Sequence, residues 1–194
     1  MRLLSTVCLA VLVAAPALAG GPTTVQPEPA PTPAPAAVAD FDWTGFYVGA
    51  FTGGNGVVNY GSPGHYSPAG VHAGYLRDFG KLVVGGELAY MKGNPDGIDG
   101  LDLVSTRAKL IGGLSLGKFM PYAFAGVSHF AFDYDTSSPD DNFTLHGVGA
   151  RLALGASGRH VIGIEYSVEK DNDFNGFGAP AEITETSIRY DFRF

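Results

Sequence analysis

The sequence predicts an all-β protein, an eight-stranded antiparallel up-and-down transmembrane β-barrel. Only 16% of the 194 residues are charged, whereas 28 residues are glycine and 12% are aromatic. An ordinary soluble domain contains about 25% charged residues and about 7% glycine. After Trp43, apolar and polar residues alternate in eight runs, and the gaps between these runs alternate between long and short. Period-two alternation is typical of strands that have one apolar face.

The composition also excludes other classes of protein. Hydrophobic residues make up 45% of the chain, which argues against disorder over most of its length. The net charge is −7, and the 12 lysines and arginines form no basic run. A nucleic-acid-binding protein needs a basic surface, so that function is not expected.

Residues 1–19 have the pattern of a cleaved secretory signal peptide. Arg2 precedes an apolar stretch that ends in the small-residue cleavage pattern Ala17-Leu18-Ala19. A transmembrane helix is the alternative, but Pro16 interrupts the run before it reaches about 20 apolar residues. The one cysteine, Cys8, lies in this segment, so no disulfide or cysteine-based site is expected in the mature chain.

Residues 20–41 are rich in proline and alanine, which predicts a semi-extended tether in the periplasm. A solvated linker is the favoured interpretation, and contact with the cell wall or a partner is the alternative. The barrel is expected to occupy residues 42–194. Its predicted strands are residues 43–53, 69–77, 81–91, 101–113, 121–131, 143–154, 160–170 and 182–194. The six prolines of this region fall in gaps or at the first residue of a strand, where a β-ladder tolerates them.

The predicted connections are long at 54–68, 92–100, 132–142 and 171–181, and short at 78–80, 114–120 and 155–159. Bacterial outer-membrane barrels have this arrangement, with short periplasmic turns and longer extracellular loops. With eight strands, both ends of the barrel chain lie on the side of the short turns.

The two faces of the strands differ in the same way along the chain. In residues 160–170, for example, Ile162 and Ile164 alternate with Gly163 and Glu165. A charge facing lipid at mid-bilayer costs roughly 2–4 kcal/mol, so the charged face is expected to line the interior. The residues predicted to pair there are Glu87, Arg107, Lys109, Arg151, Glu165, Glu185 and Arg189.

Residues 121–131 do not define their orientation clearly. The favoured register directs Tyr122, Phe124 and Phe130 outward and His129 inward. A soluble secreted barrel of the lipocalin kind remains the alternative for the whole region. It would direct the apolar face inward, and the charged inner face argues against it.

Three stretches carry a resemblance to a known family. They are Trp43-Thr44-Gly45-Phe46-Tyr47-Val48-Gly49 after the proline-rich segment, residues 105–127, and the ending Tyr190-Asp191-Phe192-Arg193-Phe194. Together they resemble the OmpA-like outer membrane immunogenic proteins of Gram-negative bacteria. The resemblance implies an integral protein of the cell outer membrane, and it implies that Tyr190, Phe192 and Phe194 form the terminal signal read by the barrel assembly machinery.

A twelve-residue calcium pattern, D-x-D-x-N-G-x5-E, begins at Asp171 and includes Asp173, Asn175 and Glu182. These side chains supply the oxygen ligands that calcium prefers. The pattern normally lies between two helices, whereas strands are expected on both sides here. The favoured interpretation is therefore an acidic solvated loop, with calcium binding as the alternative. No other cofactor is expected.

No constellation of catalytic residues stands out. The only His-x-Ser sequence is His65-Tyr66-Ser67 in the first long gap, and the neighbours Ser128 and His129 point to opposite faces of a strand. We expect a non-enzymatic, monomeric structural protein and surface antigen whose loops serve adhesion or ligand contact. Its expected surroundings are outer-membrane lipid and lipopolysaccharide. A small channel or transport protein is the first alternative, and a lipid-modifying enzyme is the second.

Overall fold

The computed structural model describes residues 41–194 except 54–55, 61, 96–101, 134–139 and 174–179. The predicted signal peptide and nearly all of the tether lie outside the described residues. Among the residues described, no helix is long and apolar enough to cross a membrane. The strands are β1 (Gly45–Gly53), β2 (Gly56–Tyr60), β3 (Ser62–Asp78), β4 (Leu82–Pro95), β5 (Asp102–Leu114), β6 (Phe119–Asp133), β7 (Asp140–Leu154), β8 (His160–Asp171) and β9 (Ala181–Arg193).

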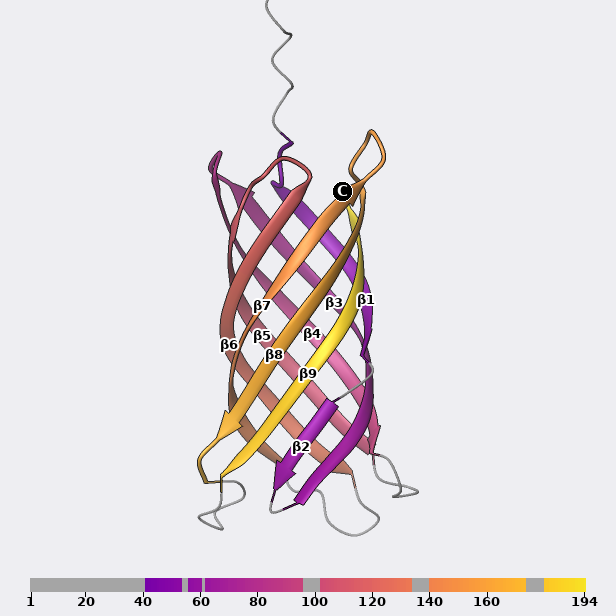
Figure 1. Cartoon of the computed structure of the whole chain (residues 1–194), viewed down its shortest axis with the longest axis vertical. Helices are drawn as coiled ribbons and strands as arrows, with labels where there is room; N and C mark the ends of the chain where they lie inside the picture. Colours follow the sequence, from indigo (N-terminus) through magenta and orange to yellow (C-terminus); the bar gives the residue numbers. More distant parts are fainter. Residues whose placement is uncertain (1–40, 54–55, 61, 96–101, 134–139, 174–179) are drawn as a thin grey trace, which may run out of the picture. The chain divides into compact units, whose positions relative to one another are not determined.

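The strands form a closed antiparallel barrel (Figure 1). From β3 to β9, each strand pairs with its neighbour in the chain. Both β1 and β2 lie between β3 and β9, with Tyr47 opposite Arg193 and Val58 opposite Ile183. Because these two strands share one position in the wall, the nine strands form an eight-stranded barrel. The predicted fold class is confirmed.

Three tight connections, residues 79–81, 115–118 and 155–159, lie at one end of the barrel, which we call the short-turn end (top of Figure 1). The start of β1 and the end of β9 lie at this end too, as the even strand count predicts. Gly80, Gly117 and Gly155 have φ angles of 96°, 67° and 67°. Residues with a side chain rarely adopt these angles, so the glycines make the tight turns possible.

The strands extend farther than the alternation predicts. Residues 56–60 and 62–68, which were expected in a loop, form β2 and the first part of β3. A ladder of backbone hydrogen bonds does not itself require that apolar and polar side chains alternate along the strand. Pro68 therefore lies inside a strand, contrary to the prediction. It is tolerated there because it lies opposite the break between β1 and β2, where the ladder is interrupted.

The alternation correctly predicts which side chains face inward on β4, β5, β7, β8 and β9. Glu165 is 4% exposed, for instance, whereas its neighbour Ile164 is 53% exposed. The favoured orientation of β6 is wrong. Its rings of Tyr122, Phe124 and Phe130 are buried inside the barrel, and His129 is exposed on the outside.

Glycines on β7 explain this orientation. Tyr122 lies opposite Gly149, and Phe124 lies opposite Gly147. A Cβ atom on Gly149 would be 2.4 Å from the Tyr122 ring, and a Cβ atom on Gly147 would be 2.4 Å from the Phe124 ring. Each ring therefore covers a glycine and fills the space that a second side chain would need.

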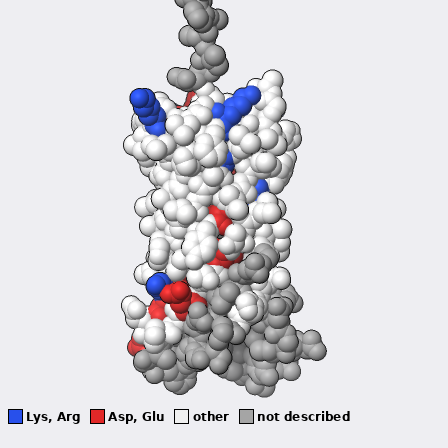
Figure 2. All heavy atoms as spheres, viewed as in Figure 1, with Lys and Arg blue, Asp and Glu red and all other residues white. Residues whose placement is uncertain are grey.

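The outer wall changes character along its height. Near the short-turn end it exposes apolar side chains such as Leu110, Val148 and Ile188. Figure 2 shows that the wall there is largely uncharged, with basic side chains gathered at the short-turn end. Farther from that end the exposed side chains become polar, and they include Lys92, His129, Asn142, Thr144, His146 and Lys170.

Candidate functional site in the barrel interior

The interior of the barrel is packed in three layers. Along β4, the inward residues run from Val83 through Glu87 to Met91. Val83 belongs to an apolar cluster near the short-turn end, together with Trp43, Leu76, Ile111, Met120, Ala153 and Val161. Met91 belongs to a second apolar cluster nearer the opposite end, together with Tyr66, Leu103, Phe130, Phe143, Ala181 and Ile183. Glu87 belongs to a layer of charged residues between the two clusters.

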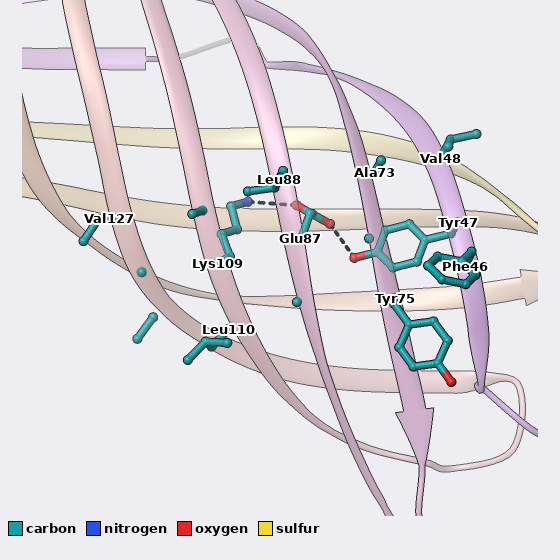
Figure 3. Close-up of a pocket in the computed structure, with 15 residues that line it drawn as sticks. Phe46, Tyr47, Val48, Ala73, Tyr75, Glu87, Leu88, Lys109, Leu110 and Val127 are labelled. Atoms are coloured by element: carbon teal, nitrogen blue, oxygen red, sulfur yellow. Dashed lines mark hydrogen bonds and ion pairs between the residues drawn. The ribbon is translucent and has the colours of Figure 1, made fainter.

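Glu87 is the centre of the first part of this charged layer. Its Oε2 lies 2.9 Å from an Arg151 nitrogen, and Arg189 binds the same oxygen. Its Oε1 lies 3.3 Å from Lys109 Nζ. The hydroxyl of Tyr47 donates a hydrogen bond of 2.8 Å to Oε2 (Figure 3). One buried carboxylate therefore joins three cations from three different strands.

Glu165 and Asp191 extend this part of the layer. Arg189 Nη1 lies 2.6 Å from Glu165 Oε2, and Lys109 forms an ion pair with Glu165 Oε1. The Tyr122 hydroxyl donates to Glu165 at 2.8 Å, so the inward ring of β6 has a polar partner at its tip. Asp191 Oδ1 lies 2.6 Å from His72 Nε2, which adds β3 to the network.

A second group of charges surrounds Arg107. One of its terminal nitrogens lies 2.7 Å from both Glu169 Oε1 and Glu185 Oε2. The Tyr66 hydroxyl donates a 3.2 Å hydrogen bond to Glu185, and the Ser128 hydroxyl bonds to Glu169. This group therefore links β3, β5, β6, β8 and β9 across the interior.

The charges of the layer are close to balance. Five carboxylates (Glu87, Glu165, Glu169, Glu185 and Asp191) face four cations (Arg107, Lys109, Arg151 and Arg189). Each of these cations contacts at least one of the carboxylates. Buried charges need such partners, because removing them from water costs several kcal/mol for each ion. The arrangement joins opposite walls of the barrel and occupies its interior.

The segment before β1 covers the interior at the short-turn end. Trp43 Nε1 donates a 2.9 Å hydrogen bond to the carbonyl of Gly117, and Trp43 N donates to Asp78 Oδ2 at 3.1 Å. The Arg193 guanidinium lies 5.2 Å from the centre of the Trp43 ring. Hydrogen bonds from Thr44 hold the pKa of the neighbouring Asp42 carboxyl below its ordinary value. These contacts hold the Trp43 ring against the apolar cluster, where it covers the interior at the short-turn end.

The structure places all seven predicted interior residues in the charged layer. Arg107 and Glu185 contact each other in the second group, and the other five form the group around Glu87 and Glu165. Glu169 and Asp191 lie on the predicted inner face and join the network as partners that were not expected. His72 is a further partner, and sequence reasoning missed it. The signal that identifies it is alternation, because His72 and Leu76 lie on the same face of β3.

The other predicted sites lie outside the interior. Asp171 ends β8, Asp173 is exposed, and Glu182 forms a 2.8 Å ion pair with Lys170. Asn175 lies outside the described residues, so the calcium loop stays a prediction. Within the described ranges, no group of three or more His, Cys, Asp or Glu residues is placed to hold a metal. His65 and Ser67 are exposed on β3, on either side of the inward Tyr66, whereas a loop was expected there. Tyr190 and Phe194 are exposed on the outer wall.

Comparison with known proteins identifies the fold. No family model matches the sequence, and no curated protein matches it. Among solved structures, Neisserial surface protein A has a TM-score of 0.61 at 18% identity, over 78% of this chain and 98% of that one. The attachment invasion locus protein Ail of Yersinia pestis has a TM-score of 0.51 at 15% identity, over 77% and 99%. The N-terminal β-barrel domain of Pseudomonas aeruginosa OprF has a TM-score of 0.50 at 14% identity, over 78% and 99%. At these identities the likeness shows the fold alone, that of the small outer-membrane β-barrels.

Proposed function

We propose that this small barrel is an integral protein of the bacterial outer membrane, exported by a signal peptide at residues 1–19. It serves as a monomeric, non-enzymatic structural protein whose extracellular part is available for adhesion or ligand contact. The short-turn end faces the periplasm, and the apolar part of the wall lies in the bilayer. A closed barrel suits this location, because it leaves no strand edge unpaired in lipid.

The packed interior is the observation that carries the proposal. An eight-stranded barrel has an interior just wide enough for side chains to fill. Here paired charges fill the middle, and an apolar cluster lies on each side of them. Side chains packed in this way oppose a continuous path of water through the described part of the barrel, which supports the structural role over the channel alternative.

The outer surface is therefore the best candidate for function. The wall continues beyond the apolar part as paired strands with exposed polar side chains such as Asn142, Thr144 and Lys170. These side chains suit contact with the sugars and phosphates of lipopolysaccharide or with a partner. One protein of the same fold, Ail, is named for attachment and invasion. The likeness carries only the fold, so adhesion by this chain is our proposal.

The partners that we propose follow from the membrane location. They are outer-membrane lipid, lipopolysaccharide and the barrel assembly machinery. The machinery would read the terminal aromatic residues Tyr190, Phe192 and Phe194. Substitution of Phe194 by alanine would then lower the amount of barrel in the outer membrane without changing the sequence of any buried layer.

Two measurements on the full chain test the proposal. Unboiled protein from isolated outer membranes is expected to migrate faster on an SDS gel than boiled protein. An epitope tag inserted in residues 134–139 is expected to bind antibody on intact cells, and the same tag in residues 115–118 only after the cells are opened. A soluble protein with one unshifted band would contradict the membrane location. Exposure of the tag in residues 115–118 on intact cells would contradict the orientation.

A further inference from the structure

The outer wall has a hollow in its apolar part, near the short-turn end. The hollow has a volume of about 840 Å³ and is bordered by β1, β3, β4, β5 and β6. Its floor consists of the small outward residues Ala73, Gly86, Ala108 and Ala125. In Figure 3, Phe46 and Tyr75 lie together at one end, and Leu110 and Val127 lie toward the other. We call this feature the outer hollow.

The floor consists of small residues because successive side chains of a strand point to opposite faces, so a strand that directs its large side chains inward has small ones outside. On β6 the large rings point inward, so only Ala123, Ala125 and Val127 remain on the outer face of its central part. Gly86 on β4 lies opposite Leu110 on β5, and Leu88 lies opposite Ala108, so small and large residues alternate across the wall. The Phe46 and Tyr75 rings, with centres 4.8 Å apart, close one side.

A cation lies just beyond this apolar surface. Arg77 is exposed on the outer face of β3, two residues from Tyr75 in the direction of the short turn. Its guanidinium lies 6.0 Å from the centre of the Phe79 ring. Within the described part of the chain, no ion pair within 4.0 Å involves Arg77. Its charge still contributes to lowering the pKa of Asp42. Lys81, Lys118 and Arg159 are exposed in the three short turns, so this end of the barrel attracts anions.

We propose that the outer hollow and Arg77 form a binding site for one anionic phospholipid of the periplasmic leaflet. One acyl chain lies in the hollow against Gly86 and Ala108, and the phosphate contacts the Arg77 guanidinium. The volume lies in the range of about 300–1,000 Å³ that is typical of small-molecule sites. The inference rests on the proposed membrane location, because a lipid chain occupies the hollow only if this wall faces the bilayer.

A second copy of the chain is a less suitable occupant. Barrels insert in one direction, so a second copy would bring its own basic short-turn end to the same height in the membrane. Its Lys81, Lys118 and Arg159 would then approach Arg77, and like charges repel. A phosphate at the same place has the complementary charge.

Native mass spectrometry of the folded barrel in detergent tests the site, with 1-palmitoyl-2-oleoyl-phosphatidylglycerol as the probe. Wild type is expected to retain one lipid per barrel. Ala108→Phe fills the hollow and is expected to abolish the adduct, whereas Ala150→Phe, on the outer face of β7, is the matched control and should retain it. Arg77→Gln is expected to weaken binding by about fivefold, the upper range for an exposed ion pair. Arg159→Gln is its control.

Several outcomes would overturn the proposal. Equal lipid retention by Ala108→Phe and Ala150→Phe would show that the hollow is not the site. Equal retention of uncharged dioleoylglycerol, with no effect of Arg77→Gln, would remove the role of the phosphate. A dimer in wild type that disappears in Ala108→Phe would assign the hollow to a second copy. The shift between unboiled and boiled protein on SDS gels, measured for every variant, distinguishes loss of this site from loss of the barrel itself.

Discussion

Glu87 shows, at the scale of one residue, how the interior is held together. Its side chain contacts Lys109, Arg151 and Arg189, which come from β5, β7 and β9. Buried charges of this kind depend on their partners, because a charge left alone in the interior keeps its full desolvation cost. Glu87 therefore stabilises the barrel mainly because it neutralises three buried cations, and less through its attraction to any one of them.

We predict that Glu87→Gln lowers the free energy of unfolding by about 3–5 kcal/mol, because it leaves three cations with fewer partners. Urea unfolding in lipid vesicles, followed by the fluorescence of Trp43, the one tryptophan of the chain, measures this loss. Glu182→Gln is the control, since its partner Lys170 is half exposed and such pairs contribute about 0.2–1 kcal/mol. Equal losses in the two variants would contradict a special role for the interior network.

At the scale of one element, the orientation of β6 depends on its neighbour. The strand has aromatic residues on one face and alanines on the other, and either face suits lipid when β6 is considered alone. The glycines of β7 decide between them, because Gly147 and Gly149 leave space inside the barrel for Phe124 and Tyr122. The same relation holds between β1 and β3, where Tyr47 lies opposite Gly74 and Phe51 lies opposite Gly70. An aromatic residue opposite a glycine on a neighbouring strand is thus the signal that would have oriented β6.

We expect Gly149→Ala to destabilise the barrel by about 1–3 kcal/mol, the usual cost of overpacking a well-packed interior. The new methyl group would be 2.4 Å from the Tyr122 ring and 2.8 Å from the Ile164 carbonyl oxygen. Gly112→Ala is the matched control, because a Cβ atom there has no neighbour within 4 Å. Unfolding in urea of both variants measures the difference. A loss in Gly112→Ala as large as that in Gly149→Ala would mean that the alanine acts through the backbone rather than through the ring.

At the scale of the whole molecule, closure of the barrel gives the two faces of one sheet different environments. The outer face is apolar where lipid is expected, and the inner face holds charges that pair with one another and with the hydroxyl groups of inward side chains. Apolar clusters on both sides of the charged layer separate it from the two ends. The outer hollow is a consequence of the same construction, since large rings turned inward leave small residues outside.

The packed interior predicts that the purified barrel adds no steady conductance to a planar lipid bilayer. The physical reason is that an ion would have to pass two apolar layers and displace paired charges. Recordings on wild type test this directly, with the boiled protein as the control for contamination by other channels. Regular conductance steps that change size in Arg107→Gln would favour the channel alternative instead.

The sequence by itself determined the class of fold, the position of the short turns and the inward face of most strands. It could do so because alternation with a period of two is a local property, and a charge in lipid is costly wherever it occurs. Only the tertiary structure decided which charges meet. Glu87 and Arg189 are 102 residues apart, and their contact depends on the stagger at which the barrel closes. It also decided the orientation of β6 and the outer hollow. Both depend on the size of side chains on neighbouring strands, and the sequence of one strand does not show which side chains lie beside it.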